Sequence, residues 1–171
     1  MSKLSLYLLV LVALTISTPS GWTQEVEIEN VPNELLKEIE LGQFAQSYSL
    51  DGSVNPFYLR GDFDGDGKAD YAFRIKARKD RSSGIAIWLT SLRKFVVLGA
   101  GVSFTISGNP NTNLDFLDTW QVYGKRPVER GVKAGNPPQL IGEAILAGKR
   151  ESASGLIYWN GKSFTWYQQG D

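Results

Sequence analysis

Hydrophobic residues from position 48 onward occur in short runs separated by Gly, Asn, Asp and Ser, which is typical of strands joined by turns. These runs predict strands at Phe57–Arg60, Tyr71–Ala77, Ile85–Thr90, Phe95–Leu98, Leu140–Leu146, Gly155–Trp159 and Ser163–Tyr167. The last two flank Asn160-Gly161, which predicts a type I′ hairpin with positive φ at both turn residues. The short connections favour antiparallel pairing.

A helical spacing of apolar residues precedes the strands. Leu35, Leu36 and Ile39 fall on one side of a helix predicted over Asn30–Gln46, and Gly42 is a candidate stop within it. The sequence therefore predicts an α+β fold, in which an antiparallel β-sheet carries an N-terminal helix packed against it.

The first residues have the order of a secretory signal peptide. Lys3 gives a positive start, Leu4–Ile16 is apolar, and Ser17–Thr23 is small and turn-forming. The apolar run is shorter than the roughly 20 residues that a membrane span needs, although an uncleaved signal anchor is the alternative. We expect cleavage after Ser20, Gly21 or Thr23.

The predicted organisation is a signal peptide at 1–23 and a single globular calcium-binding domain at 24–171. No second long apolar stretch follows. We therefore expect a secreted or periplasmic protein without stable membrane insertion after cleavage.

The amino-acid composition limits the kinds of site and partner that the chain can have. The chain has 18 basic and 18 acidic residues, so its charge gives no electrostatic case for nucleic acid. It contains no Cys and no His. Disulfides, thiolate zinc sites and histidine general bases are therefore excluded.

The stretch between 61 and 71 carries the strongest chemical signal. Four aspartates occupy positions one, three, five and nine of a loop with glycine at position six, so that alternate side chains can point inward to a cation. Calcium binds 6–8 oxygen ligands in a flexible shell. The alternative is a solvated acidic turn that binds nothing. The predicted Ca²⁺ ligands are the side chains of Asp62, Asp64, Asp66 and Asp70 and the carbonyl of Lys68, with Gly65 and Gly67 shaping the loop.

This D-x-D-G-D-G-x-x-D pattern resembles the calcium loops of FG-GAP (integrin-type) and VCBS repeats. It also resembles small exported bacterial proteins with one such segment ahead of a strand and a final aromatic hairpin, here Gly61–Ala72 and Ile157–Phe164. The resemblance implies a calcium loop within a strand hairpin. Position twelve is Phe73 and not the Glu of an EF-hand, and a single copy excludes a complete propeller.

The function predicted from these features is a calcium-binding domain with a non-catalytic binding, structural or inhibitor-like role. Its partner would be an envelope or extracellular protein, and the sequence does not determine its identity or the oligomeric state. The alternative is a small envelope hydrolase that uses an aspartate pair, for which Asp115 and Asp118 are the candidates.

Overall fold

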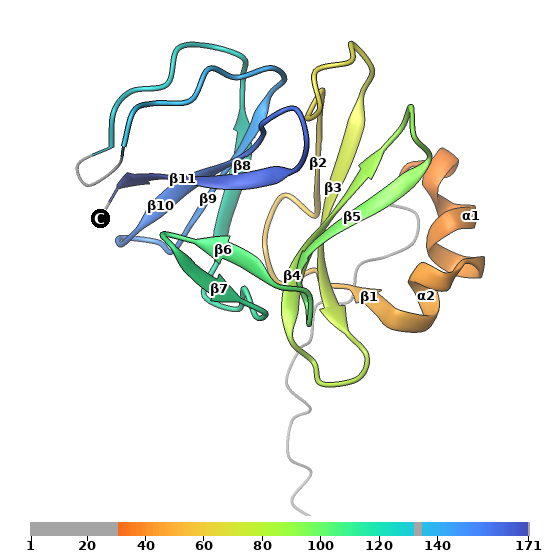
Figure 1. Ribbon diagram of the computed structural model, residues 1–171. Coiled ribbons are helices and arrows are strands. Elements are labelled where there is room, and N and C mark those ends of the chain that lie inside the picture. Colours follow the sequence, from red (N-terminus) through yellow and green to blue (C-terminus); the bar gives the residue numbers. More distant parts are fainter. Residues whose placement is uncertain (1–30, 132–134, 171) are drawn as a thin grey trace, which may run out of the picture.

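The computed structural model describes residues 31–131 and 135–170, so the predicted signal peptide lies outside the described residues (Figure 1). Two antiparallel sheets and a small hairpin dominate these residues. The first sheet contains β1 (Tyr48–Leu50), β2 (Tyr58–Gly61), β3 (Asp70–Ala77), β4 (Ser83–Leu89) and β5 (Lys94–Gly99). The hairpin consists of β6 (Phe104–Ile106) and β7 (Asn109–Asn111), and the second sheet of β8 (Thr119–Tyr123), β9 (Ala144–Gly148), β10 (Ser154–Trp159) and β11 (Phe164–Gly170).

Strand order follows the chain closely. The first sheet has the order β1-β3-β4-β5, with β2 pairing along the other half of β3, and the second has the order β11-β10-β9-β8. The two sheets face each other (Figure 1). Side chains from both sheets fill the space between them. Ala72 from β3, Ile87 from β4, Ile145 from β9 and Ile157 from β10 are fully buried in this core or nearly so.

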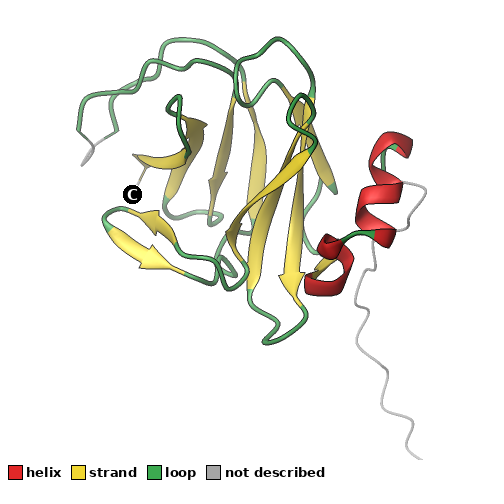
Figure 2. Cartoon of the chain, turned by 45° about the vertical axis from the view of Figure 1, so that its right-hand side comes forward, coloured by secondary structure: helices red, strands yellow, loops and turns green. Residues whose placement is uncertain are grey.

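The two helices cover the outer face of the first sheet. These are α1 (Asn33–Leu41) and α2 (Gln43–Ser47), and they lie beside one side of the sheet pair (Figure 2). Leu35 and Phe44 pack with Phe73, Ile75 and other residues on that face of the sheet. The alternation of β3 between this cluster and the central core explains why nearly all of its side chains are buried.

The described residues between β8 and β9, 124–131 and 135–143, form an irregular segment that covers the outer face of the second sheet. Val128 and Leu140 from this segment pack with Tyr123, Leu156 and Tyr167. The segment therefore gives the second sheet the apolar cover that the helices give the first.

The fold is β-rich and matches the predicted α+β class only loosely. The segment predicted as one helix forms two short helices separated at Gly42, and its first residue, Asn30, lies outside the described residues. Neither helix in the described residues is long and apolar enough to cross a membrane.

The predicted type I′ turn at Asn160-Gly161 is wrong. Only Gly161 has a positive φ, at 93°. The Asn160 side-chain oxygen instead accepts hydrogen bonds from the backbone N–H groups of Lys162 and Ser163. These bonds stabilise a four-residue loop between Trp159 and Phe164, because asparagine can hold a turn through its side chain without adopting a left-handed conformation.

Candidate metal site

The acidic loop connects two neighbouring strands, β2 and β3. Their register pairs Gly61 with Asp70, so the loop closes directly at the ends of a hairpin. The side chains of β2 are only partly buried, whereas nearly all of those of β3 are buried. Asp70 is thus the last residue of the sequence pattern and the first residue of β3.

Three of the predicted ligands lie together. Asp62, Asp64 and Asp70 each offer a carboxylate oxygen, and these oxygens lie within 4.8 Å of one another. Asp62 and Asp64 are half-buried, whereas Asp70 is fully buried. This group could hold a metal ion, since oxygen ligands at this separation can bind one cation together.

Asp70 is held by two backbone groups from different elements. One carboxylate oxygen accepts a hydrogen bond of 3.1 Å from the Phe63 N–H, and the other accepts one of 2.9 Å from the Thr90 N–H. The Thr90 hydroxyl in turn donates to the Ala69 carbonyl at 2.6 Å. The carboxylate therefore links the loop to the end of β4.

Asp62 organises the turn itself. Its two carboxylate oxygens accept hydrogen bonds of 2.9 Å from the Gly65 N–H and 3.0 Å from the Gly67 N–H. Both glycines have a positive φ, of 80° and 85°, which other residues rarely adopt. The sequence pattern thus places glycine where the curved loop needs it.

Asp66 lies outside the group of three. It is exposed, and its carboxylate accepts a hydrogen bond of 2.8 Å from the Lys68 N–H. A hydrogen bond from Ser91, together with the one from the Lys68 N–H, lowers the pKa of Asp66. The ligand roles of Asp66 and of the Lys68 carbonyl remain predictions.

A residue that sequence reasoning missed secures the loop from the second sheet. Glu143, just before β9, accepts a 2.9 Å hydrogen bond from the Asp62 N–H, and its own N–H donates to the Asp62 carbonyl at 2.7 Å. Its neighbour Gly142 lies so close that a Cβ there would be 2.4 Å from the Asp62 carbonyl oxygen. No local sequence signal could reveal this contact, because 81 residues separate its two partners.

The charges of the group are uncompensated by basic side chains. Within the described part of the chain, the ion pairs are Lys76–Asp51 and Arg93–Glu38, and neither involves the loop. Burial raises the pKa of Asp70 to about 6, and the charge of Asp64 contributes. The pKa of Asp64 is also raised, first by burial and then by the charges of Asp66 and Asp62. A bound cation would relieve this repulsion.

The raised pKa of Asp70 predicts a pH dependence of stability. In the folded chain the Asp70 carboxyl keeps its proton up to about pH 6, whereas its ordinary pKa is 3.8. The protonated carboxyl therefore contributes its full stabilisation below pH 3.8 and loses it as the pH rises through 6. With a chelator present, we expect the free energy of unfolding of the wild type, relative to Asp70→Asn, to fall by on the order of 2 kcal/mol between about pH 4 and 7. Denaturant unfolding of both proteins measures this difference, and a difference constant with pH would contradict it. A cation bound to the ionised carboxylate would suppress the fall.

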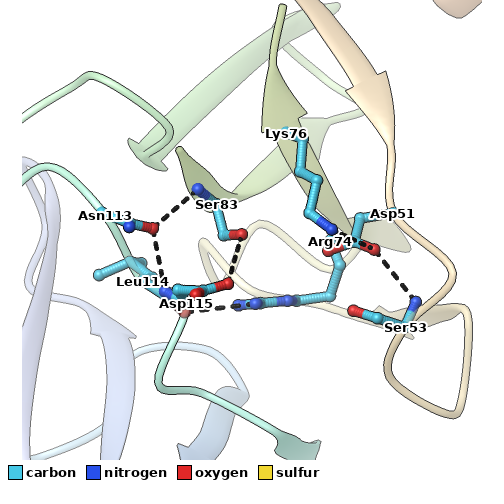
Figure 3. A network of polar contacts seen from close by, with 8 residues as sticks. All are labelled: Asp51, Ser53, Arg74, Lys76, Ser83, Asn113, Leu114 and Asp115. Atoms are coloured by element: carbon cyan, nitrogen blue, oxygen red, sulfur yellow. Dashed lines mark hydrogen bonds and ion pairs between the residues drawn. The ribbon is translucent and has the colours of Figure 1, made fainter. Parts of the chain in front are cut away.

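The aspartates of the alternative hydrolase prediction have separate partners. Asp115 accepts a hydrogen bond of 3.1 Å from the Ser83 hydroxyl, within the network around the buried Arg74 (Figure 3). Asp118 accepts one of 2.7 Å from the Arg150 N–H in the turn between β9 and β10. Both contacts connect segments of the fold, and neither is a contact between the two carboxylates.

Arg74 in that network is only 3% exposed and donates to the Leu114 carbonyl, while Asp51 pairs with Lys76 beside it (Figure 3). Burial lowers the pKa of Arg74, and the charges of Asp51 and Asp115 oppose that effect. The network shares no residue with the acidic loop.

Comparison with protein-family models finds no matching family. Searches of curated proteins and of solved structures find no match either.

Proposed function

We propose that the loop between β2 and β3 binds Ca²⁺ and that the chain is an exported calcium-binding domain with a binding or structural role. The observation that carries the proposal is the cluster of Asp62, Asp64 and Asp70, whose carboxylate oxygens lie within 4.8 Å with no ion pair to a basic side chain among the described residues. Asp70 in particular is fully buried. An acidic group removed from water needs a compensating charge, which a divalent cation supplies.

The ligand chemistry favours calcium over zinc and copper. The three clustered groups are carboxylates, and the chain has neither His nor Cys. Zinc and copper prefer nitrogen and sulfur ligands, whereas calcium takes oxygen ligands in a flexible arrangement. Asp66 lies in the same turn, so a small rotation of its exposed carboxylate would bring it to the ion. Asp66 and the Lys68 carbonyl would then complete the coordination.

A structural role follows from what the loop connects. Asp70 reaches the Thr90 N–H, and Asp62 exchanges two hydrogen bonds with Glu143 next to the second sheet. An ion bound between these aspartates would fix the β2–β3 hairpin against β4 and β9 together. We therefore propose that calcium stabilises the contact between the sheets in a secreted or periplasmic protein that acts by contacting an envelope or extracellular partner.

Thermal unfolding with and without calcium tests the proposal. A site without a bidentate Glu at position twelve should have a dissociation constant of about 10⁻⁴–10⁻³ M, as extracellular modules do. At a free calcium concentration about tenfold above that constant, binding adds roughly 1.4 kcal/mol of stability, which raises Tm by a few degrees. Asp64→Ala should abolish the shift, since it removes one of the three clustered carboxylates.

Asp80→Ala is the matched control, because Asp80 also lies in an exposed turn and accepts hydrogen bonds, from Ser82, outside the acidic loop. This variant should keep the full calcium shift. A wild-type Tm that neither calcium nor chelator changes would refute the proposed calcium site.

A further inference from the structure

A groove lies between the β6–β7 hairpin and strand β11. Figure 1 shows this hairpin beside the second sheet. Its volume is about 630 Å³, within the range of small-ligand sites. It shares no lining residue with the acidic loop. The proposed calcium site therefore leaves this groove without a role.

An aromatic platform forms part of the groove. The six-membered ring of Trp166 lies over Gly155 of the neighbouring strand, where an added Cβ would be 2.2 Å from a ring atom. The Trp166 indole N–H also donates a 2.9 Å hydrogen bond to the Gln168 side chain. The glycine and the hydrogen bond hold the ring in one position, and Trp166 still lines the groove. Phe116, which is 41% exposed, adds a second ring from a different segment.

Polar groups are fixed beside these rings. The Ser107 hydroxyl donates a 2.7 Å hydrogen bond to the Gln168 side-chain oxygen, which joins the hairpin to β11. The Gln168 amide nitrogen donates to the Gly170 carbonyl, and its second N–H is available. Ser107 keeps the acceptor capacity of its oxygen. The groove thus combines a rigid aromatic surface with neutral hydrogen-bonding groups.

Among the described residues, none that lines the groove has a charged side chain, although charged residues make up 21% of the sequence. A phosphate, a carboxylate or a cationic ligand would find no counter-charge among these residues. A sugar ring fits these conditions, because one of its faces presents C–H groups that carry partial positive charge toward the negative face of an aromatic ring. Its hydroxyls can donate to the Ser107 oxygen and accept from the second Gln168 N–H.

We propose that the groove between the β6–β7 hairpin and β11 binds a neutral glycan, with Trp166 and Phe116 stacking on sugar rings and Ser107 and Gln168 contacting hydroxyls. The site recognises uncharged oligosaccharides and rejects their uronic acid counterparts. Calcium at the acidic loop is not part of it.

Calorimetric titration of the purified chain with neutral hexasaccharides of β-1,4-glucose, α-1,4-glucose and β-1,4-N-acetylglucosamine tests the proposal. We expect saturable binding of at least one of them, weakened roughly tenfold by Trp166→Ala and by Phe116→Ala, since each removes one stacked ring. Phe116 is partly exposed, so Phe116→Ala should keep the wild-type Tm. This variant therefore tests the proposal even if Trp166→Ala unfolds the chain. Leu92→Ala removes another exposed apolar side chain, 54% exposed in the β4–β5 turn, and should leave binding unchanged.

Three outcomes would overturn the proposal. One is the absence of binding to all the neutral hexasaccharides, and another is binding that Phe116→Ala leaves unchanged. The third is tighter binding of hexagalacturonate, or of an extended Thr-Val octapeptide that pairs with β11, than of any neutral sugar.

Discussion

Asp70→Ala is expected to lower the free energy of unfolding by about 3 kcal/mol, measured by denaturant unfolding in the presence of chelator. The variant removes the acceptor of two hydrogen bonds, from the Phe63 and Thr90 N–H groups, at a fully buried position. The Phe63 N–H would then be buried without a partner and the Thr90 N–H half-buried without one, and leaving a buried donor unpaired costs more than the bond itself contributes. For a domain of this size, the corresponding decrease in Tm is about 10 °C.

Two controls separate this effect from the general loss of an aspartate in the loop. Asp70→Asn keeps one carbonyl acceptor and removes the charge, so we expect a smaller loss of stability together with loss of the calcium response. Asp66→Ala changes an exposed side chain and should lower stability far less than Asp70→Ala does. Equal destabilisation by Asp70→Ala and Asp66→Ala would show that burial of Asp70 does not decide the stability of the loop.

Gly142→Ala is expected to destabilise the chain by about 3 kcal/mol and to weaken calcium binding at least tenfold. The added Cβ would lie 2.4 Å from the Asp62 carbonyl oxygen and 2.6 Å from the Gly65 nitrogen, and both are backbone atoms that cannot rotate away. The loop must therefore move from β9, which breaks the two hydrogen bonds between Asp62 and Glu143. Calcium titration followed by Tm measures both effects in one series.

Gly124→Ala provides the matched control, because a Cβ at that position would meet its nearest neighbour, a Glu143 side-chain oxygen, at an ordinary 4.0 Å. Gly124 follows β8 and Gly142 lies just before β9, so both are next to a strand of the second sheet. The two variants therefore differ mainly in the contact with the loop. If Gly142→Ala keeps wild-type stability and calcium affinity, the close approach of β9 does not position the aspartates.

The strands of this protein could be predicted largely from local pattern. Runs such as Tyr71–Ala77 and Phe95–Leu98 combine high β-propensity with turn residues at both ends, and the structure contains β3 and β5 over nearly the same ranges. The short strand β1, the hairpin of β6 and β7, and strand β8 were not predicted. Strand β7 consists of Pro110 between two asparagines, which have low β-propensity, and pairing with β6 holds it in extended form.

The carboxylates of the candidate site could likewise be predicted, because their chemistry depends on spacing within nine residues. The alternation of aspartates with Gly65 and Gly67 is enough to bring Asp62 and Asp64 toward Asp70. A local pattern can specify a local turn, since the hydrogen bonds that shape it run from Asp62 to residues three and five positions later.

Tertiary structure alone decided which other elements hold that loop. Thr90 and Glu143 lie 20 and 81 residues from their partners, and nothing in their local sequence marks them as neighbours of an acidic turn. The groove beside β11 likewise depends on tertiary structure, because its residues Phe116, Ser107 and Trp166 come from separate segments. Sequence spacing determines what a single turn can do, whereas contacts across the core depend on strand order and on the packing of the two sheets, which only the folded chain defines.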